Sequence, residues 1–96
     1  MPTFAQTDRF RRDFAGLTAM EKGDFRAAAA KFVADLSSGR FHPGLRVRGV
    51  QGAAGVFEMT WAHDGRATFE YGPAVRDGEV HVVWRRIGTH EIFARP

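Results

Sequence analysis

The chain has 96 residues, with 14 lysines and arginines against 11 acidic residues, so its formal net charge is +3. This length predicts a single domain, residues 1–96, with a small core. The lack of cysteine excludes disulfides and thiolate metal sites. No apolar run approaches the roughly 18 residues of a membrane span. We also expect no signal peptide ahead of the first predicted strand. We therefore expect a cytoplasmic protein.

The first elements are a strand and a short helix. Residues 2–6 read as a strand, and Asp8 is expected to cap the helix that follows. Apolar side chains recur there at the spacing of one helical face, namely Phe10, Phe14 and Leu17.

A second helix follows almost without a linker. Thr18 and Glu21 form a capping box at its start, and Gly39 is a natural C-cap. Its apolar stripe predicts the buried face, which is formed by Phe25, Ala28, Ala29, Phe32, Val33 and Leu36. Because so little chain joins the two helices, they should form a helical hairpin.

Residues 40–55 are rich in glycine and contain no acid, which predicts a loop or an irregular entry into a strand. The segment is basic, and nearly all basic residues of the chain are arginines. Arginine is suited to RNA phosphates, although a GC-rich genome also enriches it. The predicted basic rim consists of Arg40, His42, Arg46 and Arg48. If the backbone is extended, Arg46 and Arg48 point the same way.

Three strands complete the chain. Residues 56–62 and 66–71 alternate apolar and polar side chains around a turn at 63–65, and residues 79–87 are the most apolar strand. The fold class is therefore α+β: an N-terminal strand, a helical hairpin, then an antiparallel β-meander with one face partly open. The expected core consists of Phe10, Phe14, Phe25, Phe32, Leu36, Phe57, Met59, Phe69, Val83 and Trp84.

The last strand runs into residues that can hold and cut an RNA backbone. Arg86 can hold phosphate by a fork of two hydrogen bonds. His90 can carry a proton near neutral pH, and Phe93 offers a face for a base. Arg85 is a further candidate for RNA contact, although strict alternation would turn it toward the opposite face. The competing interpretation is structural: a surface ion pair for Arg86 and simple packing for His90 and Phe93.

Arg86-x-Gly88-Thr89-His90, followed by Phe93, resembles the C-terminal signature of RelE/ParE-superfamily toxins, especially the YafQ-like branch of ribosome-dependent mRNA endonucleases. The resemblance extends over nearly the whole order of elements. It implies a toxin of a toxin–antitoxin pair that cleaves mRNA on the ribosome, with a cognate antitoxin as partner and no cofactor.

In that family, Arg86 would hold the scissile phosphate and His90 would carry a proton. Arg66 matches an arginine at a strand start, with Gly65 where the family has tyrosine, so it is either RNA-binding or structural. Many members also carry an arginine or histidine where this chain has Thr60 or Trp61. His63 lies close enough in sequence to substitute.

The alternatives are a non-enzymatic, ParE-like protein that binds DNA gyrase, or a degenerate member that only binds RNA or protein. The missing residue at Thr60 or Trp61 favours the first of these, whereas Arg86 and His90 favour the nuclease. The four histidines lack the spacing of a zinc site, so we expect no metal.

Overall fold

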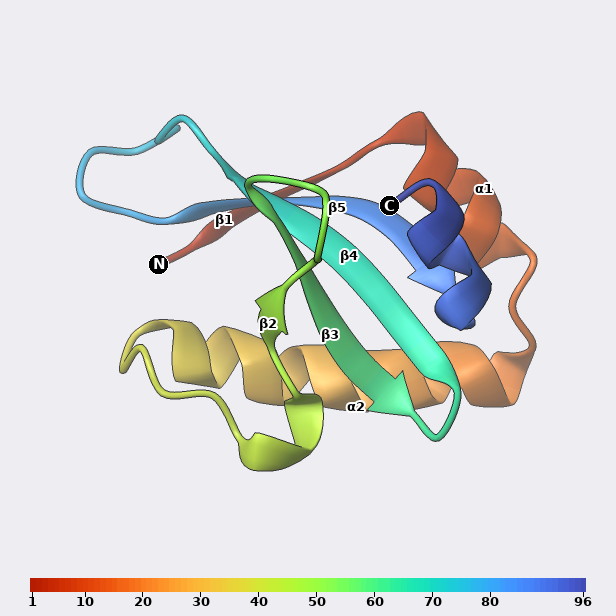
Figure 1. The fold of residues 1–96 in the computed structure, drawn as a ribbon. Helices are drawn as coiled ribbons and strands as arrows, with labels where there is room; N and C mark the ends of the chain where they lie inside the picture. Colours follow the sequence, from red (N-terminus) through yellow and green to blue (C-terminus); the bar gives the residue numbers. More distant parts are fainter.

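The computed structural model describes all 96 residues and has the predicted α+β class. The elements are β1 (Thr3–Gln6), α1 (Asp8–Ala15), α2 (Ala19–Leu36), η1 (Pro43–Leu45), β2 (Arg48–Gly49), β3 (Val56–Ala62), β4 (Gly65–Gly72), β5 (His81–Gly88) and η2 (His90–Ala94), where η marks a 3₁₀-helix. The five strands form one sheet in the order β1-β5-β4-β3-β2 (Figure 1). β1 runs parallel to β5, and the other neighbours are antiparallel.

The predicted meander of β3, β4 and β5 is confirmed, and the sequence missed two small elements. The segment 40–55 contains η1 and the two-residue strand β2, which pairs with β3 at the edge of the sheet. Arg46 adopts a left-handed backbone with φ of 47° at the end of η1. Because the chain is not extended there, the prediction that Arg46 and Arg48 point the same way by alternation does not apply.

The helix starts show local capping, with one correction. The cap of α1 is Thr7 and not Asp8: the Thr7 hydroxyl accepts from the Phe10 N–H at 3.0 Å and donates to the Arg85 carbonyl at 2.8 Å. Asp8 is the first helical residue, where a negative charge favours the helix dipole. The capping box of Thr18 and Glu21 at α2 is confirmed.

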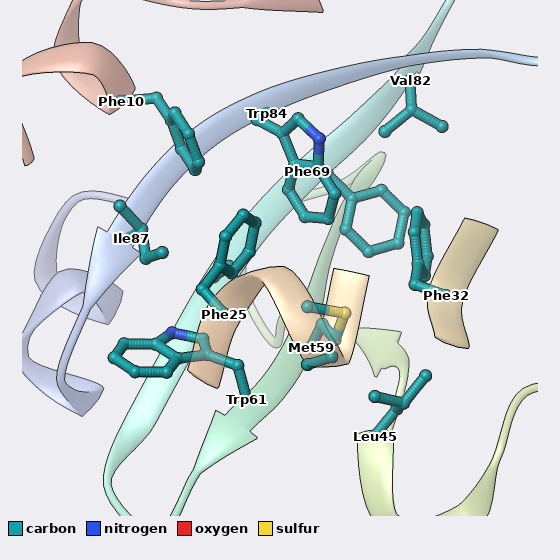
Figure 2. Close-up of a cluster of buried hydrophobic side chains, with 12 residues drawn as sticks. Phe10, Phe25, Phe32, Leu45, Met59, Trp61, Phe69, Val82, Trp84 and Ile87 are labelled. Atoms are coloured by element: carbon teal, nitrogen blue, oxygen red, sulfur yellow. The ribbon is translucent and has the colours of Figure 1, made fainter. Parts of the chain in front are cut away.

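The core lies between the helices and one face of the sheet, and it is mainly aromatic (Figure 2). The ring centroid of Phe32 lies 4.9 Å from that of Phe69 and 5.3 Å from that of Trp84, and Phe25 meets Trp84 edge-on at 5.4 Å. Such tilted and edge-to-face pairs add stabilisation beyond the buried area. Of the expected core, these residues are buried: Phe10, Phe25, Phe32, Met59, Phe69 and Trp84.

The rest of the expected core is only partly buried. Phe14, Leu36 and Phe57 pack against its margin. Val83 is a correction: it pairs with Glu70, whereas its neighbours Val82 and Trp84 occupy the core positions of β5. Since side chains alternate along a strand, Val83 lies on the sheet face that the helices do not cover, called here the open face.

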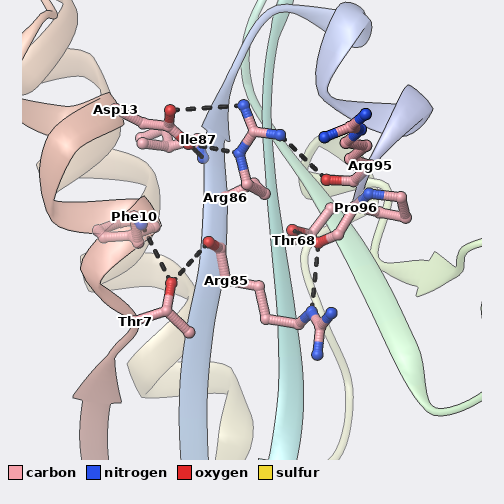
Figure 3. A network of polar contacts seen from close by, with 9 residues as sticks. All are labelled: Thr7, Phe10, Asp13, Thr68, Arg85, Arg86, Ile87, Arg95 and Pro96. Atoms are coloured by element: carbon pink, nitrogen blue, oxygen red, sulfur yellow. Dashed lines mark hydrogen bonds and ion pairs between the residues drawn. The ribbon is translucent and has the colours of Figure 1, made fainter.

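A β-bulge in β5 overturns a second prediction. Thr68 pairs with Arg86 and Phe69 pairs with Trp84, so Arg85 is an extra residue on β5. An inserted residue breaks the alternation of side chains. Arg85 therefore does not turn away from Arg86, and both side chains reach the C-terminal segment on the open face (Figure 3).

Candidate functional site

The strand register places a polar row across the open face. Arg48 pairs with Glu58, Glu58 with Thr68, and Thr68 with Arg86, so the row crosses four strands from β2 to β5. The buried Glu58 carboxylate accepts from Arg48 Nε at 3.2 Å. Arg48 is therefore held in an ion pair and is not a free member of the predicted basic rim.

Arg86 is held at the end of this row by an acid that the sequence did not reveal. Its Nε and Nη2 donate to the two carboxylate oxygens of Asp13 on α1, at 2.7 and 3.4 Å. Its Nη1 donates to the Arg95 carbonyl at 3.0 Å. Only 15% of the Arg86 side chain and 16% of the Asp13 side chain are exposed. A guanidinium has five N–H donors, so two remain for an anion.

The C-terminal segment covers part of the open face (Figure 3). The Pro96 carbonyl accepts from the Thr68 hydroxyl at 2.8 Å and from Arg85 Nε at 3.2 Å. Arg85 Nη1 also donates to Glu70 at 3.0 Å. These contacts bury Thr68 completely and leave Arg85 already paired.

His90 faces the turn between β3 and β4, where its Nδ1 lies 2.9 Å from the Asp64 carboxylate. Both side chains are accessible, at 70% and 55% exposed. The hydrogen bond from His90 is the main cause that lowers the pKa of Asp64 below its ordinary value. The carboxylate is thus a charged partner at neutral pH. It fixes the orientation of the ring and leaves Nε2 facing away from the pair.

The sequence indicated Asp64 only as a turn residue, so its pairing with His90 was not predicted. It lies 26 positions from His90, and Asp13 lies 73 positions from Arg86. Neither distance carries a sequence signal. The turn also depends on Gly65, because a Cβ there would lie 2.6 Å from the Trp61 ring.

Several predicted residues meet instead in a larger cleft of about 800 Å³ between α2, η1 and the end of β3. His63 lines it, and its side chain is exposed and has no hydrogen-bond partner. Thr60 and Trp61 also line it; they are the two candidates for the position that the resemblance predicts to be an arginine or histidine, and Trp61 is also part of the buried core. The remaining predicted residues that line this cleft are His42, Arg46 and Arg66.

Two of these residues already have structural roles. His42 Nδ1 lies 2.5 Å from the buried carboxylate of Asp35, which also accepts from the His42 backbone N–H at 2.7 Å. Arg66 Nη1 donates to the carbonyls of Ala62, His63 and Gly65 and so closes the turn. Arg46 is exposed and unpaired.

The predicted catalytic residues therefore lie at one end of the sheet without sharing a single cleft. Arg86 lines a smaller groove of about 370 Å³, His63 lines the larger cleft, and His90 lies at the turn beside His63. Phe93 is half-buried in η2, and Arg40 is exposed in the loop after α2. No three potential metal ligands come together, and no helix is long and apolar enough to cross a membrane.

Comparison with solved structures identifies the fold. The chain superposes on YafQ from E. coli with a TM-score of 0.63 at 11% identity, covering 95% of this chain and 96% of that one. A chain of the RelB–RelE antitoxin–toxin complex from Methanococcus jannaschii gives 0.61 at 10% identity, with 94% of each covered. A metal-bound toxin from Helicobacter pylori gives 0.63 at 16% identity, covering 95% and 97%.

These likenesses define the class of fold: the chain shares the fold of YafQ and of the other solved toxins, as the order of its elements predicted. No family model and no curated protein sequence matches it. At such low identities the fold is shared while side chains differ, so the chemistry rests on the residues themselves.

Proposed function

We propose that this protein is an mRNA endoribonuclease of a toxin–antitoxin pair, acting on translating ribosomes in the cytoplasm. The observation that carries the proposal is the exposed His90–Asp64 pair at the same end of the open face as Arg86, on a fold shared with YafQ and RelE. The solved M. jannaschii protein is an antitoxin–toxin complex, which supports an antitoxin as partner here.

The proposed reaction is transesterification within the RNA chain. The 2′-hydroxyl loses its proton to a base and attacks the adjacent phosphorus, and the bond to the 5′-oxygen breaks. The products are a 2′,3′-cyclic phosphate and a 5′-hydroxyl that has gained a proton from an acid. His90 is the proposed proton carrier, oriented by Asp64, and His63 at the same turn is the candidate for the second proton transfer.

Arg86 would stabilise the charge that builds up on the phosphate. Its two remaining N–H donors are held in place because Asp13 and the Arg95 carbonyl occupy the other three. Preorganised donors of this kind lower a barrier without reorganising during the reaction. Phe93, Arg46 and Arg40 remain candidates for contacts to bases and flanking phosphates.

The test is cleavage of mRNA on translating ribosomes by matched histidine variants. His90→Ala should lower the rate by about 10²- to 10⁴-fold, the range for loss of an acid–base group. His81→Ala is the control, because His81 is bound to Thr3 at the opposite end of β5 and lines neither cleft. Equal rates for parent and His90→Ala would reject the catalytic assignment.

Arg86 requires a more conservative substitution, because alanine would leave the mostly buried carboxylate of Asp13 unpaired. Arg86→Lys keeps the charge but loses the fork, so the protein should stay folded while the rate falls by about 10²- to 10³-fold. Arg85→Lys is the control, because Arg85 lies on the same face and is already bound to Glu70.

A second candidate is a non-enzymatic toxin of the same fold that binds DNA gyrase. The ion pair between Arg86 and Asp13 favours it, as does Thr60 or Trp61 in place of the arginine or histidine that the resemblance implies. Supercoiling by gyrase in the presence of the protein separates the two functions. Inhibition of supercoiling with intact mRNA would establish this candidate and reject the nuclease.

A further inference from the structure

The smaller groove lies between α1, the end of β5 and η2, and the proposed cleavage chemistry does not use most of it. Its volume is about 370 Å³, which is within the range of pockets that hold small ligands. Three arginines from three different elements line it: Arg9 from α1, Arg86 from β5 and Arg95 after η2. Figure 3 shows Arg95 beside Arg86.

Two of the three arginines in this groove have no acidic partner. Arg9 and Arg95 are exposed, and neither guanidinium has a hydrogen bond or an ion pair. Asp13 is the acid nearest to Arg86, and its two oxygens are taken by Arg86 and the Ile87 N–H. Glu91 is the only acidic side chain in the lining.

Such a groove attracts anions by its geometry as well as its charge. A cleft lined by one sign of charge focuses the electric field, and the planar guanidinium matches the oxygens of a phosphate. The floor is narrow at Gly88, where a Cβ would lie 3.0 Å from Ile92. The Ile92 side chain of η2 therefore packs closely on β5, and the arginine side chains form the rim.

We propose that this groove binds a phosphate flanking the one that is cut, with Arg9 and Arg95 as its phosphate-binding side chains. This inference rests on the proposed function, since it assigns single-stranded RNA as the ligand of a groove that shares Arg86 with the reaction site. Continuity with Arg86 favours RNA over an acidic peptide from a partner. One arginine reaches both the groove and the cut phosphate, so consecutive phosphates of one strand can occupy them.

The experiment measures binding of a short single-stranded 2′-O-methyl RNA, which lacks the attacking hydroxyl and cannot be cut. Arg9→Ala and Arg95→Ala should each weaken binding about tenfold, the effect of one lost charge-assisted hydrogen bond. Each should also reduce the slope of log K against log salt by about 0.7, the value for one phosphate on a single strand.

Two further variants make the test specific. Arg76→Ala removes one exposed, unpaired arginine from the β4–β5 loop, far from η2 (Figure 1), and should leave both the affinity and the slope nearly unchanged. Glu91→Gln removes the single acid of the lining and should tighten binding. A merely structural role for Glu91 would not increase affinity.

The outcomes separate this inference from the proposed function. Suppose that RNA binding depends on Arg9 and Arg95 but the protein does not cut mRNA. That result would support RNA binding in the groove and reject the proposed nuclease activity. Cleavage and binding unaffected by either substitution would overturn the groove, as would a parent that does not bind the oligonucleotide. If Arg9 and Arg95 are needed only for an acidic peptide, the groove is a protein-docking site and the inference is wrong.

Discussion

The two faces of the sheet differ in the side chains they carry: one is apolar and aromatic, and the other is largely polar and charged. The helix-covered face buries aromatic rings in contact with one another, such as Phe32, Phe69 and Trp84. The open face carries polar side chains tied in pairs, from Arg48 with Glu58 to Arg86 with Asp13. Packing therefore stabilises one face, while charge is arranged on the other.

The comparison explains why we propose the open face as the place for chemistry. Apolar contacts are non-directional and tolerate no unpaired charge. The ion pairs on the open face fix guanidinium groups in position and leave some of their donors free. Stability and function should thus respond to different substitutions, and the predictions below test that separation.

The largest expected effect is on the helix face. Phe32→Ala should reduce the free energy of unfolding by about 3 to 5 kcal/mol, because Phe32 is completely buried among aromatic rings. Val83→Ala, on the open face of β5, should reduce the free energy of unfolding by about 1 kcal/mol or less. Urea denaturation of the two variants measures the difference. Equal losses would mean that the open face is packed as tightly as the core.

The next effect concerns the ion pair that crosses from α1 to β5. Asp13→Ala should destabilise the fold by about 1 to 3 kcal/mol, because it leaves Arg86 and the Ile87 N–H without their acceptor. The figure is below that of a fully buried pair, since about a sixth of each side chain is exposed. Asp8→Ala is the control on the same helix, where the partner Arg11 is exposed. Similar losses for both would show that the contact with Arg86 contributes nothing.

The sequence predicted the layers better than the contacts. Apolar periodicity located both helices and the meander, because burial imposes that pattern on every helix and strand. It did not reveal β2, which is two residues long and contains Gly49, a poor strand former. It also missed the bulge at Arg85, because alternation assumes that every residue of β5 has a partner.

The sequence indicated which residues to consider for the site, but it did not reveal the acidic residues that pair with them. Arg86 and His90 were identified from the C-terminal signature, which is local in sequence. Asp13 and Asp64, which hold them, are distant along the chain, and each had a plausible local interpretation on a helix or in a turn. Pairing of this kind depends on tertiary structure, and only the folded chain reveals it.

The third prediction concerns acid pH and compares two histidine–aspartate pairs. Hydrogen bonds from His42 and His90 lower the pKa values of Asp35 and Asp64 below 3.8, so the unfolded chain binds more protons in that range. The stability from each pair is therefore present at neutral pH and is lost as the pH falls through the lowered pKa. Asp35→Asn should flatten the acid limb of a stability–pH curve more than Asp64→Asn, because Asp35 is buried and Asp64 is exposed. The reverse order would contradict the assignment of Asp35 as the structural member.

The smallest expected effect concerns an unpaired polar group on the otherwise apolar, helix-covered face. The Trp61 indole N–H is buried without a hydrogen-bond acceptor, which costs free energy that its ring packing must offset. Trp61→Phe removes the unpaired donor but also part of the ring that packs over Gly65. The two contributions oppose each other, so stability should change by less than about 1 kcal/mol. Trp84→Phe, whose indole nitrogen is not among the unpaired buried atoms, should cost more. Thermal melts of the two variants compare them directly, and a larger loss at Trp61 would show that its N–H has an acceptor in solution.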